Sequence, residues 1–334
     1  MAISIALVVD FKQAFSEENV IAINTLGTED QPIISLDGNK LCFLYSPMDF
    51  EWFQELSPEE KMKILKKEKG IKIIGPYRKG HTENDISNKN IWFRGYCSEK
   101  VNGKWTNPTL APHELIPRDK GIYAKFMTVD NGTRLIVEAS GISIDGREIK
   151  GEGDLVTFYK QADGTWKGPF ILSDYFNTPH MEQDFHVTED GKTLIFRSDR
   201  PGTLGFGDIF ISNFENGEWS EPINIGKPIN TEDAFEAPGW LSPDKQRIYF
   251  VRAYPQPINL KKTGIYFSEK VNGIWAEPIK LDLGIATHKI FAPSLTRDEK
   301  ELYFELLPQG RKDYQIYVSH KQLDGSWSVA VPVY

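Results

Sequence analysis

Cysteine is scarce in this sequence. Only Cys42 and Cys97 occur among 334 residues, and each stands inside a probable strand. Two isolated thiols supply neither the framework of a disulfide-rich domain nor the paired cysteines of a structural zinc site. We therefore expect both thiols to be buried and reduced.

Long apolar runs are also missing. No stretch approaches the roughly 20 apolar residues that a membrane-spanning helix needs. The first residues, MAISIALVVDFKQ, have no basic start and are interrupted by Asp10, so they fit a strand better than a signal peptide. As written, the sequence predicts a cytoplasmic protein. A chain from which a leader had been removed would begin in the same way, so a periplasmic or extracellular location stays open.

Basic residues are fewer than acidic ones. The sequence has 39 lysines and arginines against 47 aspartates and glutamates, which gives a net charge of −8. This balance disfavours nucleic acid and anionic membranes as partners of the whole molecule, because both are negatively charged. It favours cations, amines, neutral sugars or a basic protein surface.

Familiar catalytic and nucleotide-binding motifs are absent. The sequence has no Gly-x-Ser-x-Gly nucleophile elbow, no phosphate-binding glycine loop, no zinc-type cysteine pair and no nucleic-acid signature. No motif of this kind assigns the chain to an enzyme class, so its status as an enzyme stays open.

The sequence does contain a repeat built from two short motifs, and a repeat of this period sets the whole fold. The first motif is SLDGNKLCF from Ser35, TVDNGTRLIV from Thr128, TEDGKTLIF from Thr188, SPDKQRIYF from Ser242 and TRDEKELYF from Thr296. The second motif is Asn/Asp-Gly-x-Trp, and it ends at Trp105, Trp166, Trp219, Trp275 and Trp327. The pattern predicts five units of four strands, A to D.

Each motif has a physical role. Asp-Gly and Asn-Gly supply the positive φ that tight hairpin turns need, so they mark the A–B and C–D turns of an antiparallel sheet. The tryptophan opens strand D and is expected to pack between neighbouring sheets. A proline three residues later, as in Trp219 to Pro222, is tolerated because an outer edge strand needs no N–H there. Small sheets repeated in this way close radially into a β-propeller.

The units resemble the repeats of TolB-type, WD40-like propellers. The likeness rests on the SerAspArgProGly run of Ser198 to Gly202, on the aspartate-led strand from Asp208 to Ser212 and on the tryptophan turn. It implies an all-β propeller and no particular activity, since relatives include protein-docking domains, periplasmic binding proteins and gating domains of peptidases. We expect five blades, at about 29–116, 117–178, 179–231, 232–287 and 288–334, in a single domain. Relatives often have six or more blades, so six remains the alternative.

Two segments depart from the repeat. Residues 1–28 are expected to form a closing segment, an extra outer strand that completes the ring against the last blade. Residues 47–90 interrupt blade one, and SPEEKMKILKKEKG within them predicts a short helix, with Ser57 and Glu60 as a capping box and Gly70 as its stop. This helical insertion either packs on the rim without further role or acts as a lid or partner-binding element.

The insertions indicate which end of the propeller carries a site. Antiparallel strands reverse direction, so the D–A joints and the B–C loops emerge at one end and the A–B and C–D turns at the other. The long insertions are B–C loops, and they therefore share the face on which the D–A joints meet the central channel. The aspartates of the A–B turns belong to the opposite face and are expected to be turn residues: Asp37, Asp130, Asp190, Asp244 and Asp298.

Acidic residues gather at the D–A joints. The catalytic candidates, if the protein is an enzyme, are Glu29, Glu182 and Glu236, which occupy one position of the repeat. The ligand-binding candidates are Asp30, His180, Asp184, Arg197, Asp233, Arg252 and His288. Glu138 and Glu305 also stand at the outgoing ends of strands B. Such groups can bind a cation, hydrogen-bond sugar hydroxyls or do acid–base work, and they can also simply cap backbone amides.

A metal site is a further alternative. His180, Glu182 and Asp184 alternate along PHMEQDFH and could share one side of an extended segment. A divalent cation in the channel would use these three side chains. Without it, we expect no cofactor.

Two functions are consistent with these features. The first is a non-catalytic binding propeller, expected to be a monomer, that recognises a protein or a small polar or carbohydrate ligand at the loop-rich acidic face. The alternative is a five-bladed carbohydrate-active hydrolase or lyase that uses the clustered carboxylates. Five-bladed glycosidases usually take carboxylates from successive blades, and blade two offers Ile122 at this position.

Overall fold

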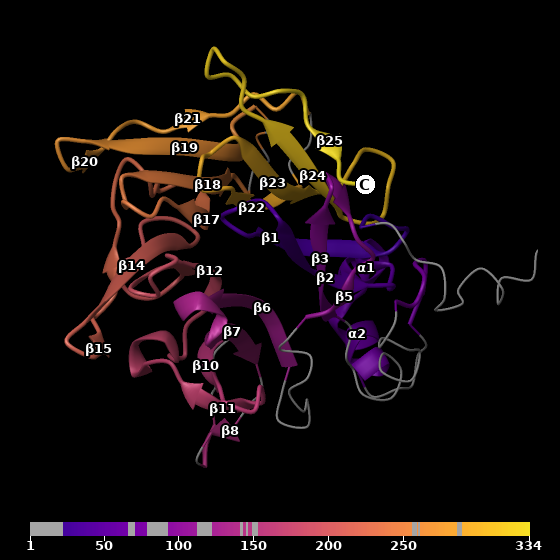
Figure 1. Ribbon diagram of the computed structural model, residues 1–334, viewed down its shortest axis with the longest axis horizontal. Helices are drawn as coiled ribbons and strands as arrows, with labels where there is room; N and C mark the ends of the chain where they lie inside the picture. The colour runs from indigo at the N-terminus through magenta and orange to yellow at the C-terminus, as the bar shows by residue number, and fades with distance from the viewer. Residues whose placement is uncertain are drawn as a thin grey trace, which may run out of the picture.

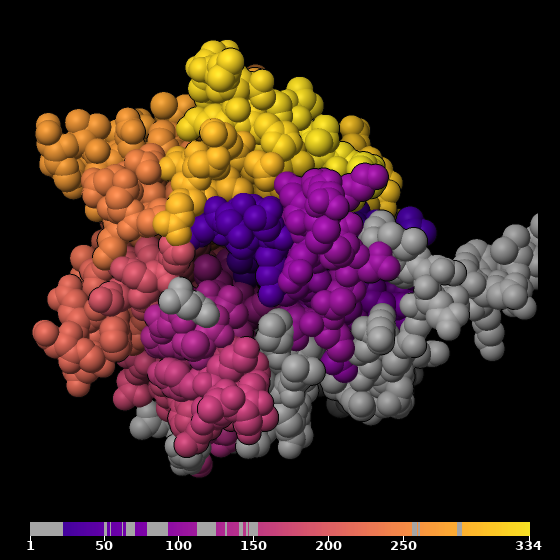
Figure 2. Space-filling model, in the orientation of Figure 1, coloured from indigo at the N-terminus to yellow at the C-terminus, as the bar shows by residue number. Residues whose placement is uncertain are grey.

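The computed structural model describes residues 23–65, 71–78, 93–111, 122–140, 143–144, 146–148, 153–255, 259, 261–285 and 289–334. Within these ranges the strands form five antiparallel blades around a ring, with each blade's first strand innermost (Figure 1). The blades follow one another around the ring in chain order, so the colours of Figure 2 change from one blade to the next. The predicted five-bladed, all-β propeller is confirmed over the described residues.

The strands of each blade are as follows. Blade one has β1 (Thr28–Ile34), β2 (Lys40–Ser46), β3 (Arg94–Val101), β4 (Lys104–Trp105) and β5 (Thr109–Leu110). Blade two has β6 (Ile122–Val129), β7 (Arg134–Ser140), β10 (Asp154–Lys160) and β11 (Trp166–Ile171), with a side hairpin of β8 (Ser143–Ile144) and β9 (Arg147–Glu148). Blade three has β12 (Glu182–Val187), β13 (Thr193–Ser198), β14 (Asp208–Glu215), β15 (Glu218–Trp219) and β16 (Ile223–Asn224).

The last two blades repeat this order. Blade four has β17 (Phe235–Leu241), β18 (Arg247–Ala253), β19 (Gly264–Val271), β20 (Ile274–Trp275) and β21 (Ile279–Lys280). Blade five has β22 (Ile290–Leu295), β23 (Glu301–Leu306), β24 (Gln315–His320) and β25 (Val331–Pro332). Two short 3-10 turns, Asp130–Gly132 and Asp174–Phe176, lie in blade two.

Strand D is split into two pieces in blades one, three and four. The break falls at Pro108, Pro222 and Pro278, between the tryptophan-bearing piece and an outer piece. Proline cannot donate to a strand ladder, so the pairing is interrupted there. Both pieces pair with strand C of the same blade, which keeps four strand positions in each blade.

The core consists of five apolar clusters, one at each interface between neighbouring blades. The tryptophans of strand D take part in these interfaces. Trp219 is buried between blades two and three, while Trp105 of blade one meets Tyr303 of blade five edge-on, with ring centroids 6.3 Å apart. The predicted packing of these tryptophans between sheets is confirmed.

The two cysteines lie directly opposite each other on β2 and β3 and form a disulfide. The expectation of reduced thiols is therefore wrong. Cys42 and Cys97 are 55 residues apart, separated by the insertion of blade one, and only the pairing of β2 with β3 brings them together.

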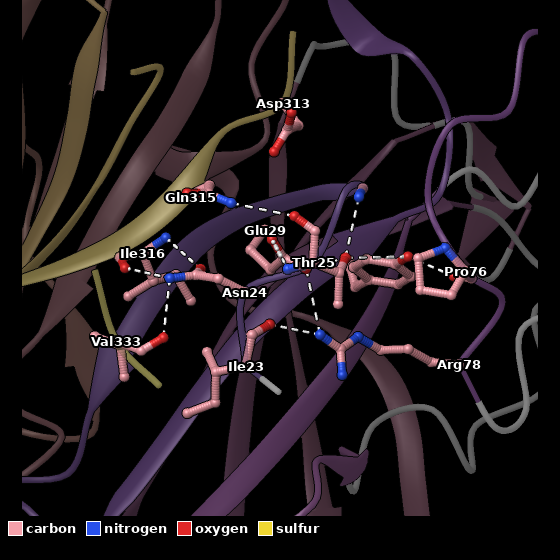
Figure 3. Close-up of polar contacts among 12 residues, drawn as sticks. Ile23, Asn24, Thr25, Glu29, Pro76, Arg78, Asp313, Gln315, Ile316 and Val333 are labelled. Carbon is pink, nitrogen blue, oxygen red and sulfur yellow. Dashed lines mark hydrogen bonds and ion pairs between the residues drawn. The ribbon is translucent and has the colours of Figure 1, made fainter. Parts of the chain in front are cut away.

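The ring is closed by hydrogen bonds between the N-terminal joint and blade five. Asn24 donates from Nδ2 to the carbonyls of Ile316 (2.8 Å) and Val333 (3.0 Å) and accepts from the Ile316 N–H at 2.8 Å (Figure 3). The outer strand of blade five is β25, so residues 23–25 act here as a joint. Residues 1–22 of the predicted closing segment lie outside the described residues.

The insertion in blade one carries two helices, α1 (Phe50–Glu55) and α2 (Pro58–Leu65). Ser57 and Glu60 cap α2 reciprocally, since the Ser57 N–H donates to Glu60 Oε2 at 3.1 Å and the Glu60 N–H to Ser57 Oγ at 3.3 Å. The predicted capping box is confirmed, and Gly70 lies outside the described residues. No helix in the described ranges is long and apolar enough to cross a membrane.

The A–B turns use their aspartates as predicted. Asp190 Oδ1 accepts from the Thr188 hydroxyl at 2.6 Å and from the Lys192 N–H at 3.0 Å. The equivalent contacts are made by Asp37, Asp244 and Asp298. Asp130 instead begins a 3-10 turn. These carboxylates fix hairpins on the face opposite the loops.

Candidate functional site

Every innermost strand has a β-bulge at the same repeat position. In blades one, three and five the bulge places Gln31, Asp184 and Ala292 in the left-handed region, with φ of 52°, 54° and 50°. A bulge re-aims the side chains around it. The strands therefore interrupt their regular alternation where they line the channel.

Three glutamates at the start of the inner strands are held by their own joints. Glu29 accepts from the N–H and hydroxyl of Thr25, and Glu236 does the same with Thr231. Glu182 repeats the arrangement with Thr178. All three glutamates are fully buried.

Each of these glutamates also pairs with one arginine, and the three arginines come from different places in the sequence. Arg252, at the end of strand B, donates from Nε to Glu236 at a distance of 2.9 Å. Arg200, in the B–C loop, donates from Nη2 to Glu182, also at 2.9 Å. In blade one, Arg78 of the insertion lies 3.3 Å from Glu29 (Figure 3).

The arginines are further held by aromatic rings of strands B and C. The guanidinium of Arg200 lies 4.7 Å from the ring centroid of Phe196 and 5.3 Å from that of Phe210. Arg252 contacts the rings of Phe250 and Tyr266, and Arg78 those of Phe43, Tyr45 and Tyr96. We call each combination of threonine, glutamate, arginine and rings a joint module.

Burial raises the pKa of Glu29 and Glu236 to about 7, against the opposing effect of their arginines. It also raises the pKa of Glu182. Their oxygens already accept hydrogen bonds from the joint and the arginine, so the modules connect each D–A joint to its own blade. Blades two and five have isoleucines at this position, Ile122 and Ile290.

A second set of charged residues lies on the ring axis. It consists of Asp30, Lys125, Glu138, Asp184, Arg197 and Glu305, and we call it the axial group. Gln31 of blade one donates to Asp184 of blade three at 3.4 Å, and blade two lies between those blades along the ring. Such a contact has to cross the channel, so the axial group sits where blades meet at the centre.

Asp184 is the ionised carboxylate of this group. Arg197 Nε donates to its Oδ2 at 2.8 Å, while Arg197 Nη2 donates to Gln183 at 2.9 Å. Burial acts to raise the pKa of Asp184, but Arg197, Lys125 and the hydrogen bonds outweigh it and lower the pKa below its usual value. The Asp184 side chain keeps 23% of its surface exposed, so water reaches it.

Asp30 and Glu305 form a carboxyl pair across the seam between blades one and five. Their carboxyl groups are close enough to influence each other's ionisation, and the Gln31 N–H donates to Glu305 Oε2 at 2.6 Å. Burial raises the pKa of both groups, and their mutual repulsion raises that of Glu305 further. Because the charge of one carboxylate opposes ionisation of the other, the pair resists losing both protons.

Glu138 is kept protonated at neutral pH. Burial and the nearby charge of Asp184 raise its pKa to about 8, against the opposing effect of Lys125 and Arg197. A neutral carboxylic acid beside an ionised carboxylate gives the channel one proton donor and one acceptor.

Lys125 completes the axial group and was missed by the sequence reading. It is 5% exposed, and its ammonium lies 5.8 Å from the ring centroid of Phe185. A comparison of the five repeats at this position could have revealed it. At this place in the bulge the other blades carry uncharged residues: Pro32, Phe185, Gly239 and Pro293.

The structure brings together only part of the predicted site. Asp30, Asp184 and Arg197 belong to the axial group, whereas Arg252 belongs to a joint module. His180 is 41% exposed and lies 3.7 Å from Asp199, and Asp233 is exposed. His288 lies outside the described residues. Among the described side chains no three histidine, cysteine or acidic groups converge for a metal, and His180, Glu182 and Asp184 each have a different partner.

Two cavities lie at the end of the propeller that carries the A–B turns, where the sequence did not indicate a site. A cavity of about 230 Å³ in the channel is lined mainly by apolar residues of all five inner strands, among them Met127, Val187 and Trp240. His186 borders it and is neutral, because burial lowers its pKa to about 3. A shallower basin of about 1200 Å³ lies beyond it, next to the ion pair of Arg297 and Glu189.

Comparisons with known proteins give structural likenesses of low sequence identity. No family model matches the sequence, and no curated protein does. Among solved structures, a putative TolB from Agrobacterium tumefaciens is 11% identical, with a TM-score of 0.44 over 92% of this chain and 81% of that one. A protein of unknown function from Dyadobacter fermentans is 12% identical, with a TM-score of 0.43 over 93% and 95%.

A third similar structure is described as Bacteroides ovatus xyloglucan PUL GH43B. It is 10% identical, with a TM-score of 0.47 over 93% of this chain and 56% of that one. Scores this low carry no functional argument, and the propeller itself rests on the strand order of this chain. The propeller expected from the repeats is confirmed as a fold by this strand order.

Proposed function

We propose that this protein is a binding propeller whose axial group recognises a small, neutral, polyhydroxylated ligand such as a carbohydrate. The observation that carries this proposal is the gathering of carboxylates from blades one, two, three and five around two cations, on the inner strands and the strands B beside them.

The charges of the axial group support a neutral ligand. At neutral pH, Asp184 is balanced by Arg197, and Glu138 keeps its proton. The single negative charge shared by Asp30 and Glu305 is balanced by Lys125. Burying a ligand with a net charge here would leave that charge uncompensated, which is costly in a poorly solvated site.

The hydrogen-bonding capacity of the group supports hydroxyls as the recognised chemistry. Lys125, Arg197 and protonated Glu138 can donate, while Asp184 and the Asp30–Glu305 pair can accept. A sugar hydroxyl both donates and accepts, so neighbouring hydroxyls can be satisfied by such an alternating set. The joint modules are poor candidates, because their carboxylates are already saturated.

Isothermal titration calorimetry would test the proposal with methyl glycosides, alditols, diamines and dicarboxylates as separate ligand classes. We expect a glycoside or alditol to bind, and Asp184→Asn to weaken that binding at least tenfold. Asp190→Asn, a turn aspartate on the opposite face, is the matched control and should bind as the wild type does. Binding by diamines or dicarboxylates alone, or by a protein partner alone, would overturn the proposal.

A second candidate is a carbohydrate-active hydrolase, favoured by one observation. The pKa of Glu138 is raised to about 8 while that of the neighbouring Asp184 is lowered, which is the separation that a general acid and a base or nucleophile require. Release of nitrophenol from aryl glycosides would test it. Activity that Glu138→Gln abolishes without loss of binding would favour this candidate over simple recognition.

A further inference from the structure

The side chain of Lys125 is the one member of the axial group that has no direct partner in the described part of the chain. No described acceptor lies within hydrogen-bonding distance of its Nζ, and no described carboxylate lies within ion-pair distance. Yet Lys125 is buried, with only 5% of its surface exposed. The Nζ atom is not among the fully enclosed polar atoms that lack a partner, so it keeps a small contact with solvent through which a ligand can reach it.

The surroundings of Lys125 suit a reactive amine. Four carboxyl groups are within electrostatic reach, in the order Asp184, Glu138, Glu305 and Asp30, and the Phe185 ring covers one side. Burial lowers the pKa of the amine, so that loss of its proton costs less than on a surface lysine. The Asp30–Glu305 pair resists losing both protons and can accept this one.

We propose that Lys125 is a nucleophile that forms an imine with a small carbonyl compound bearing hydroxyl groups, such as the open form of a reducing sugar. This inference rests on the proposed function, because the hydroxyls would be held by the axial group. It goes beyond recognition, since the ligand becomes covalently and reversibly attached.

The condensation balances with groups already present. Lys125 transfers a proton to the Asp30–Glu305 pair, and its Nζ lone pair then attacks the carbonyl carbon to give a carbinolamine. Glu138 donates its proton to the carbinolamine hydroxyl, which leaves as water while the C=N bond forms. The resulting iminium is positively charged, and the newly ionised Glu138 balances it. No oxidant, reductant or metal is required.

The pH dependence follows from all the groups that face the amine. Asp30, Glu138, Asp184 and Glu305 favour the ammonium form, while burial opposes it. His186 is neutral over this range, and the Arg197 guanidinium is held by Asp184. Imine formation should therefore rise with pH as the amine is released and fall again once Glu138 has lost its proton.

Reductive trapping would test the proposal. The wild-type protein is incubated with glyceraldehyde or a reducing pentose plus cyanoborohydride, and the adduct is located by peptide mass spectrometry. We expect a saturable adduct on the peptide containing Lys125, formed at least tenfold faster than adducts on exposed lysines such as Lys192. Equal labelling of Lys125 and the exposed lysines would overturn the proposal, and this readout requires no variant.

A variant and a second ligand class separate this inference from the proposed function. Lys125→Met should lose the fast adduct, whereas Lys192→Met should keep it. If the fast adduct is absent while methyl glycosides, which have no free carbonyl, still bind the wild type, the imine is wrong and recognition stands. If glycosides fail and the fast adduct forms, recognition of neutral glycosides is wrong and the nucleophile stands.

Discussion

The joint modules and the axial group are built from the same kinds of side chain, buried carboxylates and basic groups, but they pair them differently. In a joint module one glutamate faces one arginine and one threonine, and the arginine is sandwiched against aromatic rings. In the axial group four carboxyl groups from four blades share Lys125 and Arg197. In the first arrangement each carboxylate has its partners within one module, whereas in the second the charged groups are shared between blades.

This difference shows that acidity and burial alone do not identify a site. Glu236 is completely buried with a raised pKa, which are marks often taken for catalysis, yet its partners account for both oxygens. Asp184 is more exposed, and its pKa is lowered. The distinguishing feature is whether a charged group interacts with other blades: Glu236 has partners in its own module, whereas Asp184, besides its pair with Arg197, interacts with Gln31 of blade one and Lys125 of blade two.

Removing the carboxylate of a joint module should cause the largest loss of stability among the variants considered. Glu236→Ala strands the Arg252 guanidinium, which is 6% exposed, and leaves Thr231 without its acceptor. We expect a loss of about 3 to 5 kcal/mol in the free energy of unfolding, measured by urea denaturation. Glu232→Ala, which removes an exposed partner of Lys227 in the same joint, is the control and should change little. Equal effects of the two variants would contradict the structural role.

Detaching the insertion of blade one from the ring closure should cause the next largest loss of stability. Arg78→Ala removes the contact with Glu29 and the hydrogen bond to the Ile23 carbonyl, both of which connect the insertion to the ring closure. We expect a loss of about 2 kcal/mol or more, with faster proteolysis within residues 47–90. Lys63→Ala breaks only a surface pair with Glu59 and should leave both measurements unchanged within about 0.5 kcal/mol.

Neutralising an axial carboxylate should affect binding and spare the fold. Glu305→Gln removes one member of the carboxyl pair, and we expect at least tenfold weaker binding of the polyol ligand, about 1.4 kcal/mol. The unfolding midpoint should fall far less than in Glu236→Ala, because the Asp30 carboxyl and the amide can still hydrogen-bond. A large loss of stability with unchanged affinity would place Glu305 with the structural glutamates instead.

The pH dependence of stability should carry the signature of Glu138. Its pKa is about 8 in the folded protein and 4.5 ordinarily, so the folded state binds more protons between these values. The contribution of Glu138 to the free energy of unfolding is fully present below pH 4.5, and it is lost as the pH rises through about 8. Glu138→Gln should flatten the fall in thermal midpoint between pH 6.5 and 8.5. An unchanged slope would mean that Glu138 titrates normally.

The strands, the turns and the five repeated units could be predicted from the sequence. The Asp190 cap, the tryptophan of strand D and the Ser57 capping box each involve contacts within a few residues or a repeated pattern, so local chemistry specifies them. Asp30, Asp184 and Arg197 could be placed near the channel because strand order fixes which ends share a face.

The partners of the acidic residues could be known only from the folded chain. Glu29, Glu182 and Glu236 share one repeat position, but their arginines come from an insertion, a B–C loop and a strand end, which no repeat pattern relates. Lys125 and the cystine likewise gain their neighbours through pairing across blades or across the insertion. The physical reason is that electrostatic neutralisation depends on distances in space, and ring closure sets these between residues far apart in the chain.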